Sequence, residues 1–124
     1  VEGAVGTSDF SVSATGILVL GTANRQPGQV VWKDREGKTT GTVTEPGFDS
    51  YPALSPDGRT LALARANLRT NSLDLWTLDL DRNTSSRVTF EPGLDAFPVW
   101  SADGRTILYS SSRSGMFQVH AQDP

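Results

Sequence analysis

One short stretch decides the fold of this chain: Ser55-Pro56-Asp57-Gly58-Arg59-Thr60, which returns 46 residues later as Ser101–Thr106 with Ala in place of Pro. The segment Glu45–Asp49 returns at the same spacing as Glu91–Asp95. A fainter copy of the aromatic residue, the serine and the turn glycine lies upstream at Phe10–Gly16. Repeats at a fixed period are typical of propellers and solenoids. The chain therefore contains three repeat units, of which the first is degenerate.

Each repeat unit is predicted to form β-strands. Its apolar runs are four to seven residues long, lie between Gly, Pro and Asp residues, and are rich in β-branched and aromatic types. The Asp57-Gly58 and Asp103-Gly104 dipeptides are typical of tight turns, because Gly tolerates a positive φ and Asp bonds nearby backbone N–H groups. The strands are expected at Phe10–Ser13, Ile17–Gly21, Gln29–Lys33, Gly41–Thr44, Tyr51–Ser55, Thr60–Arg65, Leu73–Asp79, Arg87–Phe90, Phe97–Ser101, Thr106–Ser110 and Met116–His120.

Four antiparallel strands in a unit of 40–46 residues match a β-propeller blade. The second strands, at Leu61–Ala64 and Ile107–Tyr109, are apolar on both faces, as a sheet packed between two neighbouring sheets requires. A β-sandwich is the alternative, but its strands would alternate because one face is wet. The predicted fold is all-β, a propeller arc of four-stranded antiparallel blades with two complete blades and three strands of a third. One domain, 1–124, is expected to hold a linker (1–8) and blades at about 9–44, 50–90 and 96–120.

The composition excludes several classes of function. The 11 Lys and Arg residues against 14 Asp and Glu give a net charge of −3, so the basic surface of a nucleic-acid-binding protein is missing. The absence of cysteine excludes disulfides, thiolate metal sites and a cysteine nucleophile. No apolar run approaches the ~20 residues of a membrane-spanning helix, so no membrane insertion is expected. The sequence motifs of hydrolases, nucleotide-binding proteins, zinc proteases and kinases are absent too, so we predict no enzyme activity, catalytic residue, cofactor or metal.

The repeat resembles a known family. Its second unit runs from Asp49 through Tyr51-Pro52 and the Ser-Pro-Asp-Gly turn to the third strand Asp74–Asp79, and this pattern is similar to the TolB-type, WD40-like Pro-Asp β-propeller repeat. The resemblance covers Asp49–Asp123 well and Asp9–Thr44 weakly, and Ala102 departs from the family's proline. It implies a ring of about six to eight blades.

Within that family, the sequence pattern of this chain is most similar to propellers linked to bacterial Ser/Thr protein kinases. The degenerate first unit and the charged hairpin Val31–Lys38 carry this similarity. The resemblance implies a non-catalytic segment for protein or ligand recognition, a sensory or scaffolding part of a larger bacterial protein such as a kinase, in an extracytoplasmic or periplasmic location. The alternative is a propeller that belongs to an enzyme and either gates a peptidase or carries carboxylates for carbohydrate chemistry.

Two blades and three strands of a third are too few to close a ring. Only Val1–Ser8 precede the first inner strand, too few residues for a connection and an outer strand. An open arc exposes a whole blade face at each end, and such apolar surface marks an interaction site. We therefore expect either a piece of a larger propeller, partnered by its remaining blades, or a half-ring completed by a second copy as a homo-oligomer.

Candidate contact residues gather in the connections at one end of the expected channel. Asp49 and Asp95 lie before the inner strands, and Arg65, Arg69 and Arg113 lie between second and third strands. Mixed Arg and Asp side chains suit a polar ligand or a peptide terminus, because the Arg fork binds carboxylates in bidentate fashion. The alternatives are that the aspartates cap their own turns and that the arginines are solvated loop charges.

His120, the only histidine, is expected to be structural. Aligned third strands place it at the position of Trp32 and Trp76, where an aromatic side chain packs. A metal role would need carboxylate partners, and the spacing places none nearby.

Overall fold

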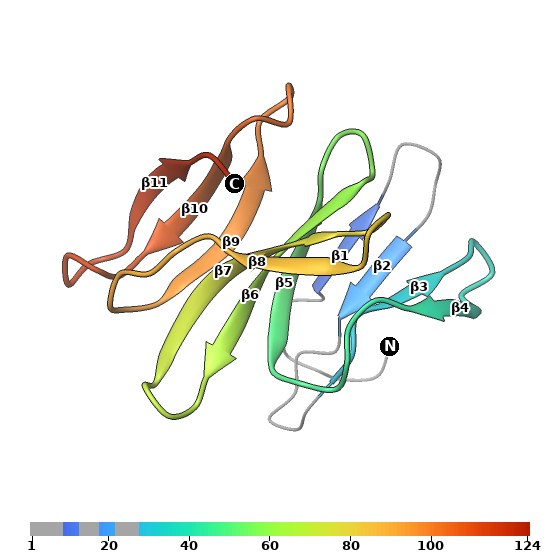
Figure 1. Cartoon of the computed structure of the whole chain (residues 1–124), viewed down its shortest axis with the longest axis horizontal. Coiled ribbons are helices and arrows are strands. Elements are labelled where there is room, and N and C mark those ends of the chain that lie inside the picture. The colour runs from blue at the N-terminus through green and yellow to red at the C-terminus, as the bar shows by residue number, and fades with distance from the viewer. Residues whose placement is uncertain (1–8, 13–17, 22–27) are drawn as a thin grey trace.

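The computed structural model describes residues 9–12, 18–21 and 28–124, and these ranges contain eleven β-strands (Figure 1). A helix long and apolar enough to cross a membrane is absent from this part of the chain. The predicted linker 1–8 and parts of the first two predicted strands lie outside it. The strands are β1 (Asp9–Val12), β2 (Leu18–Gly21), β3 (Val31–Lys33), β4 (Thr39–Thr42), β5 (Asp49–Leu54), β6 (Thr60–Asn67), β7 (Ser72–Asp79), β8 (Thr84–Arg87), β9 (Asp95–Trp100), β10 (Ile107–Ser111) and β11 (Gln118–Gln122).

The strands form three antiparallel sheets in chain order. Blade 1 has the order β1-β2-β3-β4, blade 2 has β5-β6-β7-β8, and blade 3 has three strands in the order β9-β10-β11. The first strands β1, β5 and β9 are neighbours, so the blades stand side by side as an open arc (Figure 1). The predicted fold class, a propeller arc with two four-stranded blades and three strands of a third, is therefore confirmed.

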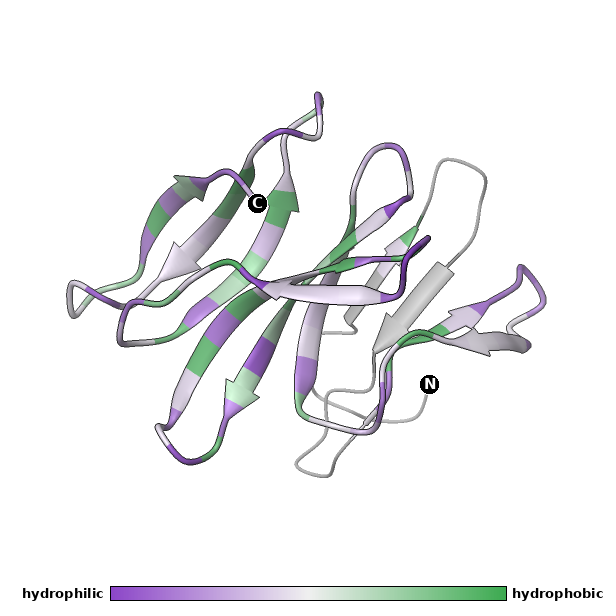
Figure 2. Ribbon diagram, in the orientation of Figure 1, coloured by the Kyte–Doolittle hydropathy of each residue, from purple (hydrophilic) through white to green (hydrophobic). Residues whose placement is uncertain are grey.

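Two hydrophobic cores hold the blades together, and both use strand β6. Leu61 and Leu63 pack with Val30 between blades 1 and 2. Ala62 and Ala64, on the opposite face of β6, pack with Ile107 and its neighbours between blades 2 and 3. Alternate residues of a strand point to opposite faces, so a strand that is apolar throughout serves two interfaces. Figure 2 shows apolar residues along these central strands and hydrophilic residues at the hairpin tips.

The Ser-x-Asp-Gly turns have the predicted geometry. Ser55 Oγ donates to Asp57 Oδ1 at 2.6 Å, and Asp57 Oδ1 also accepts the Arg59 N–H at 3.0 Å. Gly58 has a φ of 71°, in the left-handed region that glycine tolerates. The turn from Ser101 to Thr106 repeats these contacts, with 2.6 Å from Ser101 Oγ to Asp103 Oδ1. The hydrogen bond from the serine lowers the pKa of each aspartate below its ordinary value.

The first strands of blades 2 and 3 each contain a β-bulge at an aromatic-Pro pair. Tyr51 and Pro52 together oppose Leu63, and the pairing of β9 shifts at the equivalent place. Tyr51 and Phe97 have φ values of 54° and 58°, a region where bulky residues are strained. The proline that follows has no N–H to donate to the ladder, and a β-bulge is a position in a strand where proline is accommodated.

Several predicted strand bounds differ from the observed ones by up to three residues, and whole strands are displaced at β4, β8 and β11. The fourth strands β4 and β8 begin and end earlier than predicted, because pairing starts directly after the charged hairpin turns. The residues that follow them, Val43-Thr44 and Val88-Thr89, stay beside the third strand but bond it partly through a side chain. Strand β11 starts later than predicted, because Ser112–Gly115 forms a turn closed by a 2.9 Å bond from Gly115 N–H to the Ser112 carbonyl.

Candidate functional site

Asp49 and Arg65 form a bidentate ion pair at one end of blade 2. They are direct cross-strand neighbours on β5 and β6. Arg65 Nε donates to Asp49 Oδ1 at 2.7 Å, and Nη2 donates to Oδ2 at 3.0 Å. The guanidinium also lies 4.9 Å from the centre of the Trp76 ring. The alternative that Asp49 caps its own turn is therefore wrong, because the carboxylate, with its side chain 4% exposed, bonds an arginine instead.

A second pair, Asp74 with Arg87, was not predicted from the sequence. Asp74 stands beside Arg65 on the next strand, and Arg87 Nη2 lies 3.1 Å from Asp74 Oδ2. Arg87 Nε donates to the Thr89 carbonyl at 2.8 Å, and its guanidinium covers the Phe90 ring at 4.8 Å. A charged residue between two leucines in an apolar strand is the signal that could have indicated this buried carboxylate.

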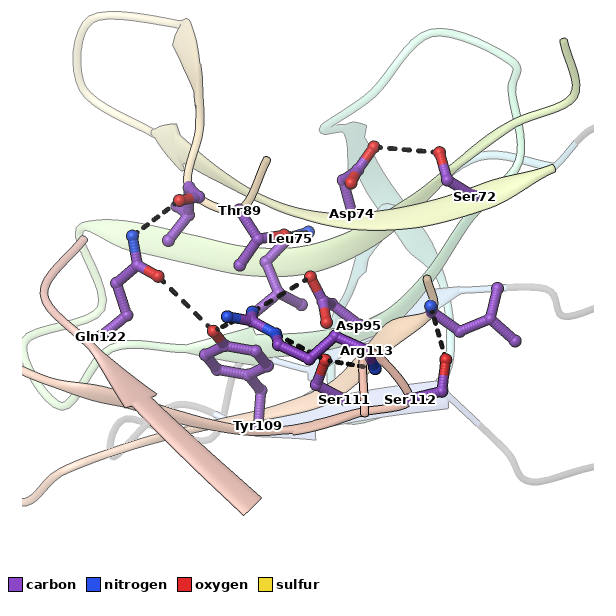
Figure 3. A network of polar contacts seen from close by, with 12 residues as sticks. Ser72, Asp74, Leu75, Thr89, Asp95, Tyr109, Ser111, Ser112, Arg113 and Gln122 are labelled. Atoms are coloured by element: carbon purple, nitrogen blue, oxygen red, sulfur yellow. Dashed lines mark hydrogen bonds and ion pairs between the residues drawn. The ribbon is translucent and has the colours of Figure 1, made fainter. Parts of the chain in front are cut away.

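Blade 3 repeats the pair in a changed form. Asp95 corresponds to Asp49, but Ser111 stands where blade 2 has Arg65. Arg113, two residues after Ser111, takes the place of that arginine, with its Nη2 3.8 Å from Asp95 Oδ2 (Figure 3). The same Nη2 donates to Tyr109 Oη at 2.8 Å, and Arg113 Nε donates to Ser111 Oγ at 3.0 Å. Asp95 is 1% exposed, and no described residue donates a hydrogen bond to either of its carboxylate oxygens.

The five predicted contact residues thus divide into three groups. Asp49 and Arg65 neutralise each other, and Asp95 is buried between blades 2 and 3 beside Arg113. Arg69 lies in the exposed β6–β7 turn, where its N–H donates to Asn67 Oδ1 at 3.0 Å, and its guanidinium forms no ion pair with any described residue. The structure gathers these residues at one end of the arc, but on separate blades rather than around one shared carboxylate pair.

His120 packs against Tyr109, as predicted. The rings are 5.8 Å apart and 26° from parallel. His120 opposes Tyr109 as Trp76 opposes Leu63, which makes the histidine and Trp76 equivalent. No group of three potential metal ligands occurs among the residues that the structure describes.

The expected equivalence of Trp32 with these residues is wrong by one position. Thr44 Oγ1 accepts the Val30 N–H, as Thr89 Oγ1 accepts the Leu75 N–H, so Val31 is the residue that corresponds to Trp76. Trp32 consequently packs toward blade 2, against the core that contains Val30. A shift by one residue in a strand turns a side chain to the opposite face.

The ion-pair end of the arc, defined by the connections 67–72, 88–94 and 112–117, also exposes apolar side chains. These are Leu68, Phe90, Leu94, Met116 and Phe117. At the opposite end, the two Ser-x-Asp-Gly turns expose no large apolar side chain, and Val12 at the end of β1 is the exposed apolar residue there among the described residues. Between blades 1 and 2 a cleft of about 610 Å³ is lined by residues that include Glu45, Phe48 and the Asp49–Arg65 pair. The ion-pair end is therefore the face that offers both apolar and polar contacts.

The comparison with protein families decides the identity of this fold. The model described as PD40, TolB beta propeller domain, matches residues 7–124. The chain belongs to the TolB β-propeller family. The resemblance of its repeats to the TolB-type Pro-Asp repeat is thereby confirmed, including the weakly similar first unit.

Solved structures share this TolB-type fold at low sequence identity. TolB from Acinetobacter baumannii is 22% identical with a TM-score of 0.77, over 94% of this chain and 30% of that one. The putative TolB from Agrobacterium tumefaciens is 21% identical with a TM-score of 0.79, over 95% and 47%. Pyrococcus horikoshii acylaminoacyl peptidase is 23% identical with a TM-score of 0.60, over 84% and 16%. This chain thus spans less than half of each of these structures, and no curated protein matches it.

Proposed function

We propose that this TolB-type segment is a non-catalytic recognition module, and that the ion-pair end binds an extended segment of a protein partner. The observation that carries the proposal is the group of exposed apolar side chains at this end of the arc. Leu68, Phe90 and Met116 lie exposed on three successive connections of the same end. Exposed apolar residues that cluster on one face and are rimmed by polar groups mark interaction surfaces.

The arginines of this end support a partner with both apolar side chains and carboxylates. Arg87 covers Phe90, and Arg113 is fixed by Tyr109 and Ser111, so both guanidinium groups are held in place before a partner arrives. Arg69 is exposed in its turn and forms no ion pair with a described residue. Arginine and aromatic residues are enriched among the residues that dominate binding energy.

A peptide-display library screened against the immobilised chain tests this proposal. Enriched peptides are synthesised and titrated against wild type, Phe90→Ala and Leu68→Ala, with Arg105→Ala at the opposite end as the matched control. We expect about tenfold weaker binding for the first two variants and no change for the control. A screen without binders, or binders that respond only to Arg105→Ala, would refute the proposed surface.

We also propose that the chain works as part of a larger assembly, supplied by further blades or by a second copy. The outer face of blade 3 exposes Val99, Leu108 and Val119, whereas the same face of blade 2 is covered by blade 3. The native mass of the purified chain distinguishes the two. A doubled mass supports a half-ring dimer, and a mass of one chain supports further blades.

A Ser/Thr kinase is the larger protein that the sequence resemblance favours, and a peptidase is the second candidate, since acylaminoacyl peptidase shares the fold. An antibody against this chain, used on extract of the source cells, separates them. The captured polypeptide is treated with labelled ATP or with a fluorophosphonate that reacts with serine hydrolases. Transfer of phosphate to Ser or Thr supports the kinase, and labelling by the fluorophosphonate supports the peptidase. If neither reaction occurs, both enzymes are contradicted and a binding protein is supported.

A further inference from the structure

Blades 2 and 3 enclose a polar cleft at the Ser-x-Asp-Gly end of the arc, opposite to the ion-pair end. Its volume is about 520 Å³, the size of a site for a small molecule. One wall is the side of β7 and β8 that faces blade 3, and the other contains Trp100 and the turn of Asp103. We name it the turn-end cleft, and the side chains that matter in it are Asp57, Thr77, Asp79, Ser86, Trp100 and Asp103.

The register of blade 2 explains why this part of the interface is polar. Ala62, Thr77 and Ser86 oppose one another on β6, β7 and β8, so all three lie on the face toward blade 3. Ala62 belongs to the hydrophobic core between blades 2 and 3. Two residues after Thr77, the same face carries Asp79. This face of blade 2 is therefore apolar where blade 3 packs against it and polar where the cleft opens.

Thr77 is a buried polar side chain that lines this cleft without a partner. Its exposure is 9%, and no hydrogen bond joins its hydroxyl to any described residue. The other two buried threonines of the described chain, Thr44 and Thr89, both accept a backbone N–H. Burial of a hydroxyl without a partner is unfavourable, and most buried polar groups are hydrogen-bonded. The Thr77 hydroxyl is thus available to a molecule bound in the cleft.

Acidic groups outnumber basic ones in the cleft, where Asp57, Asp79 and Asp103 stand against Arg82. In each aspartate, the hydrogen bonds from described residues reach Oδ1, as the Arg82 N–H does at 3.0 Å from Asp79 Oδ1. The second carboxylate oxygen is left for a ligand, and none of the three forms an ion pair with a described residue. The hydrogen bonds from the turn serines lower the pKa of Asp57 and Asp103, so both are charged at neutral pH.

The three carboxylates are spread through the cleft rather than gathered around one point. They come from the β5–β6 turn, the end of β7 and the β9–β10 turn, and the described part of the chain holds no group of three potential metal ligands. Trp100 adds an aromatic surface, and its indole N–H donates to the Ala53 carbonyl at 2.9 Å, which holds the ring in place. Separated carboxylates beside an aromatic ring suit several ammonium groups on an alkyl chain better than a single metal ion.

We propose that the turn-end cleft binds a linear organic cation that carries two or three primary or secondary amino groups. One ammonium group donates to Asp79 Oδ2 and to the Thr77 hydroxyl, and another lies against the carboxylate of Asp57 or Asp103. The alkyl chain between them covers the Trp100 ring. The cleft lies at the opposite end of the arc from the surface proposed for a protein partner, so this proposal does not depend on that one.

Spermidine is the probe, titrated by calorimetry against the whole chain at constant ionic strength. Asn replaces Asp in the variants, because it keeps the Oδ1 acceptor of the turn and removes the charge. Asp79→Asn should bind about tenfold more weakly, and Asp57→Asn and Asp103→Asn about threefold, since exposed charges contribute less. Asp81→Asn is the matched control, because Asp81 lies in the same hairpin as Asp79 but outside the cleft. It should bind like wild type.

Two substitutions of Thr77 test the buried hydroxyl. Thr77→Val keeps the shape of the side chain without the acceptor and should weaken binding about fivefold, whereas Thr77→Ser keeps the hydroxyl and should stay within about twofold of wild type. If a variant does not fold, the wild-type chain still decides through the indole N–H signals of its three tryptophans in an NMR titration. The Trp100 signal should shift on addition of spermidine, and those of Trp32 and Trp76 should not.

Three results would overturn the proposal. The first is the absence of spermidine binding up to the millimolar range, and the second is an equal loss in Asp79→Asn and Asp81→Asn. The third is equal displacement of spermidine by Mg²⁺ at the same ionic strength, which would show screening of surface charge only. Acetyl-Lys-Lys-amide serves as a second probe. Tighter binding of this peptide than of spermidine would assign the site to lysine side chains of a protein, and weaker binding would assign it to a free polyamine.

Discussion

The rings of Tyr51 and Phe97 lie 4.3 Å apart between their centres, at an interplanar angle of 42°. This contact joins the first strands of blades 2 and 3. Both residues have a positive φ and precede a proline in a β-bulge. A bulky residue in that region costs about 1–3 kcal/mol, and an aromatic pair returns about 0.5–1.5 kcal/mol beyond its buried area. The bulges therefore turn the two rings toward each other at a cost that the surrounding strands offset.

The positive φ of Phe97 predicts an unusual order of stability for small substitutions. Phe97→Gly should be at least as stable as Phe97→Ala, because alanine is strained by about 1–2 kcal/mol in the left-handed region. The matched control is Val99, exposed on the same strand, where the glycine variant should be less stable than the alanine variant by about 0.5–1 kcal/mol. Urea unfolding of the four variants measures this. The same order at both positions would contradict the backbone conformation of Phe97.

Asp49→Asn should destabilise the fold by about 2 kcal/mol, because it breaks a bidentate pair whose aspartate is buried. Asp81→Asn is the matched control. The Arg59–Asp81 pair is 3.8 Å long with both side chains at least 70% exposed, so its loss should change stability by less than about 0.5 kcal/mol. The unfolding free energy in urea provides the comparison. Equal effects of the two substitutions would show that the Asp49–Arg65 pair adds nothing to stability.

Asp95→Asn should destabilise the chain less than Asp49→Asn does, although Asp95 is the more buried of the two. Its carboxylate accepts no hydrogen bond from a described residue, and its ion pair is 3.8 Å long. Arg113 also keeps its bonds to Tyr109 and Ser111 without it. Burial of a charge with weak pairing is unfavourable, so a neutral side chain relieves part of that cost. Thermal unfolding at neutral pH checks the order, and a larger loss for Asp95→Asn would contradict it.

Acid should weaken the two Ser-x-Asp-Gly turns. The hydrogen bond from Ser55 lowers the pKa of Asp57 below its ordinary value of 3.8, and Ser101 does the same for Asp103. A lowered folded-state pKa means that this stabilisation is present above about pH 4 and is lost as the pH falls through the folded pKa. Ser55→Ala should therefore reduce the loss of stability between pH 5 and pH 2, measured as the urea midpoint. An unchanged pH dependence would show that the turn does not contribute to it.

The turns and the blade order could be predicted from the sequence, because their chemistry is local. Gly58 and Gly104 need only their neighbours to specify a turn, and the repeat spacing then fixes the sheets. The ion pairs could not be predicted, because Asp74 and Arg87 meet only when the register of β7 and β8 is known. The position of Trp32 failed for the same reason. The one-residue offset of Trp32 depends on a threonine hydroxyl, Thr44 Oγ1, that replaces a backbone acceptor, and no periodicity reveals it.

Strand β6 separates the two hydrophobic cores, because its two faces belong to different blade interfaces. Leu63 contributes to one core and Ala64 to the other, so substitutions at adjacent positions report on different interfaces. Each blade contacts its immediate neighbours, and the free energy of such an array is close to a sum over adjacent pairs. A destabilising substitution in the β9–β11 sheet should therefore disturb the core on the Ala62 face of β6 and leave the core on the Leu63 face unchanged. An assembly of this kind can lengthen, shorten or diverge at one end while the other end keeps its shape.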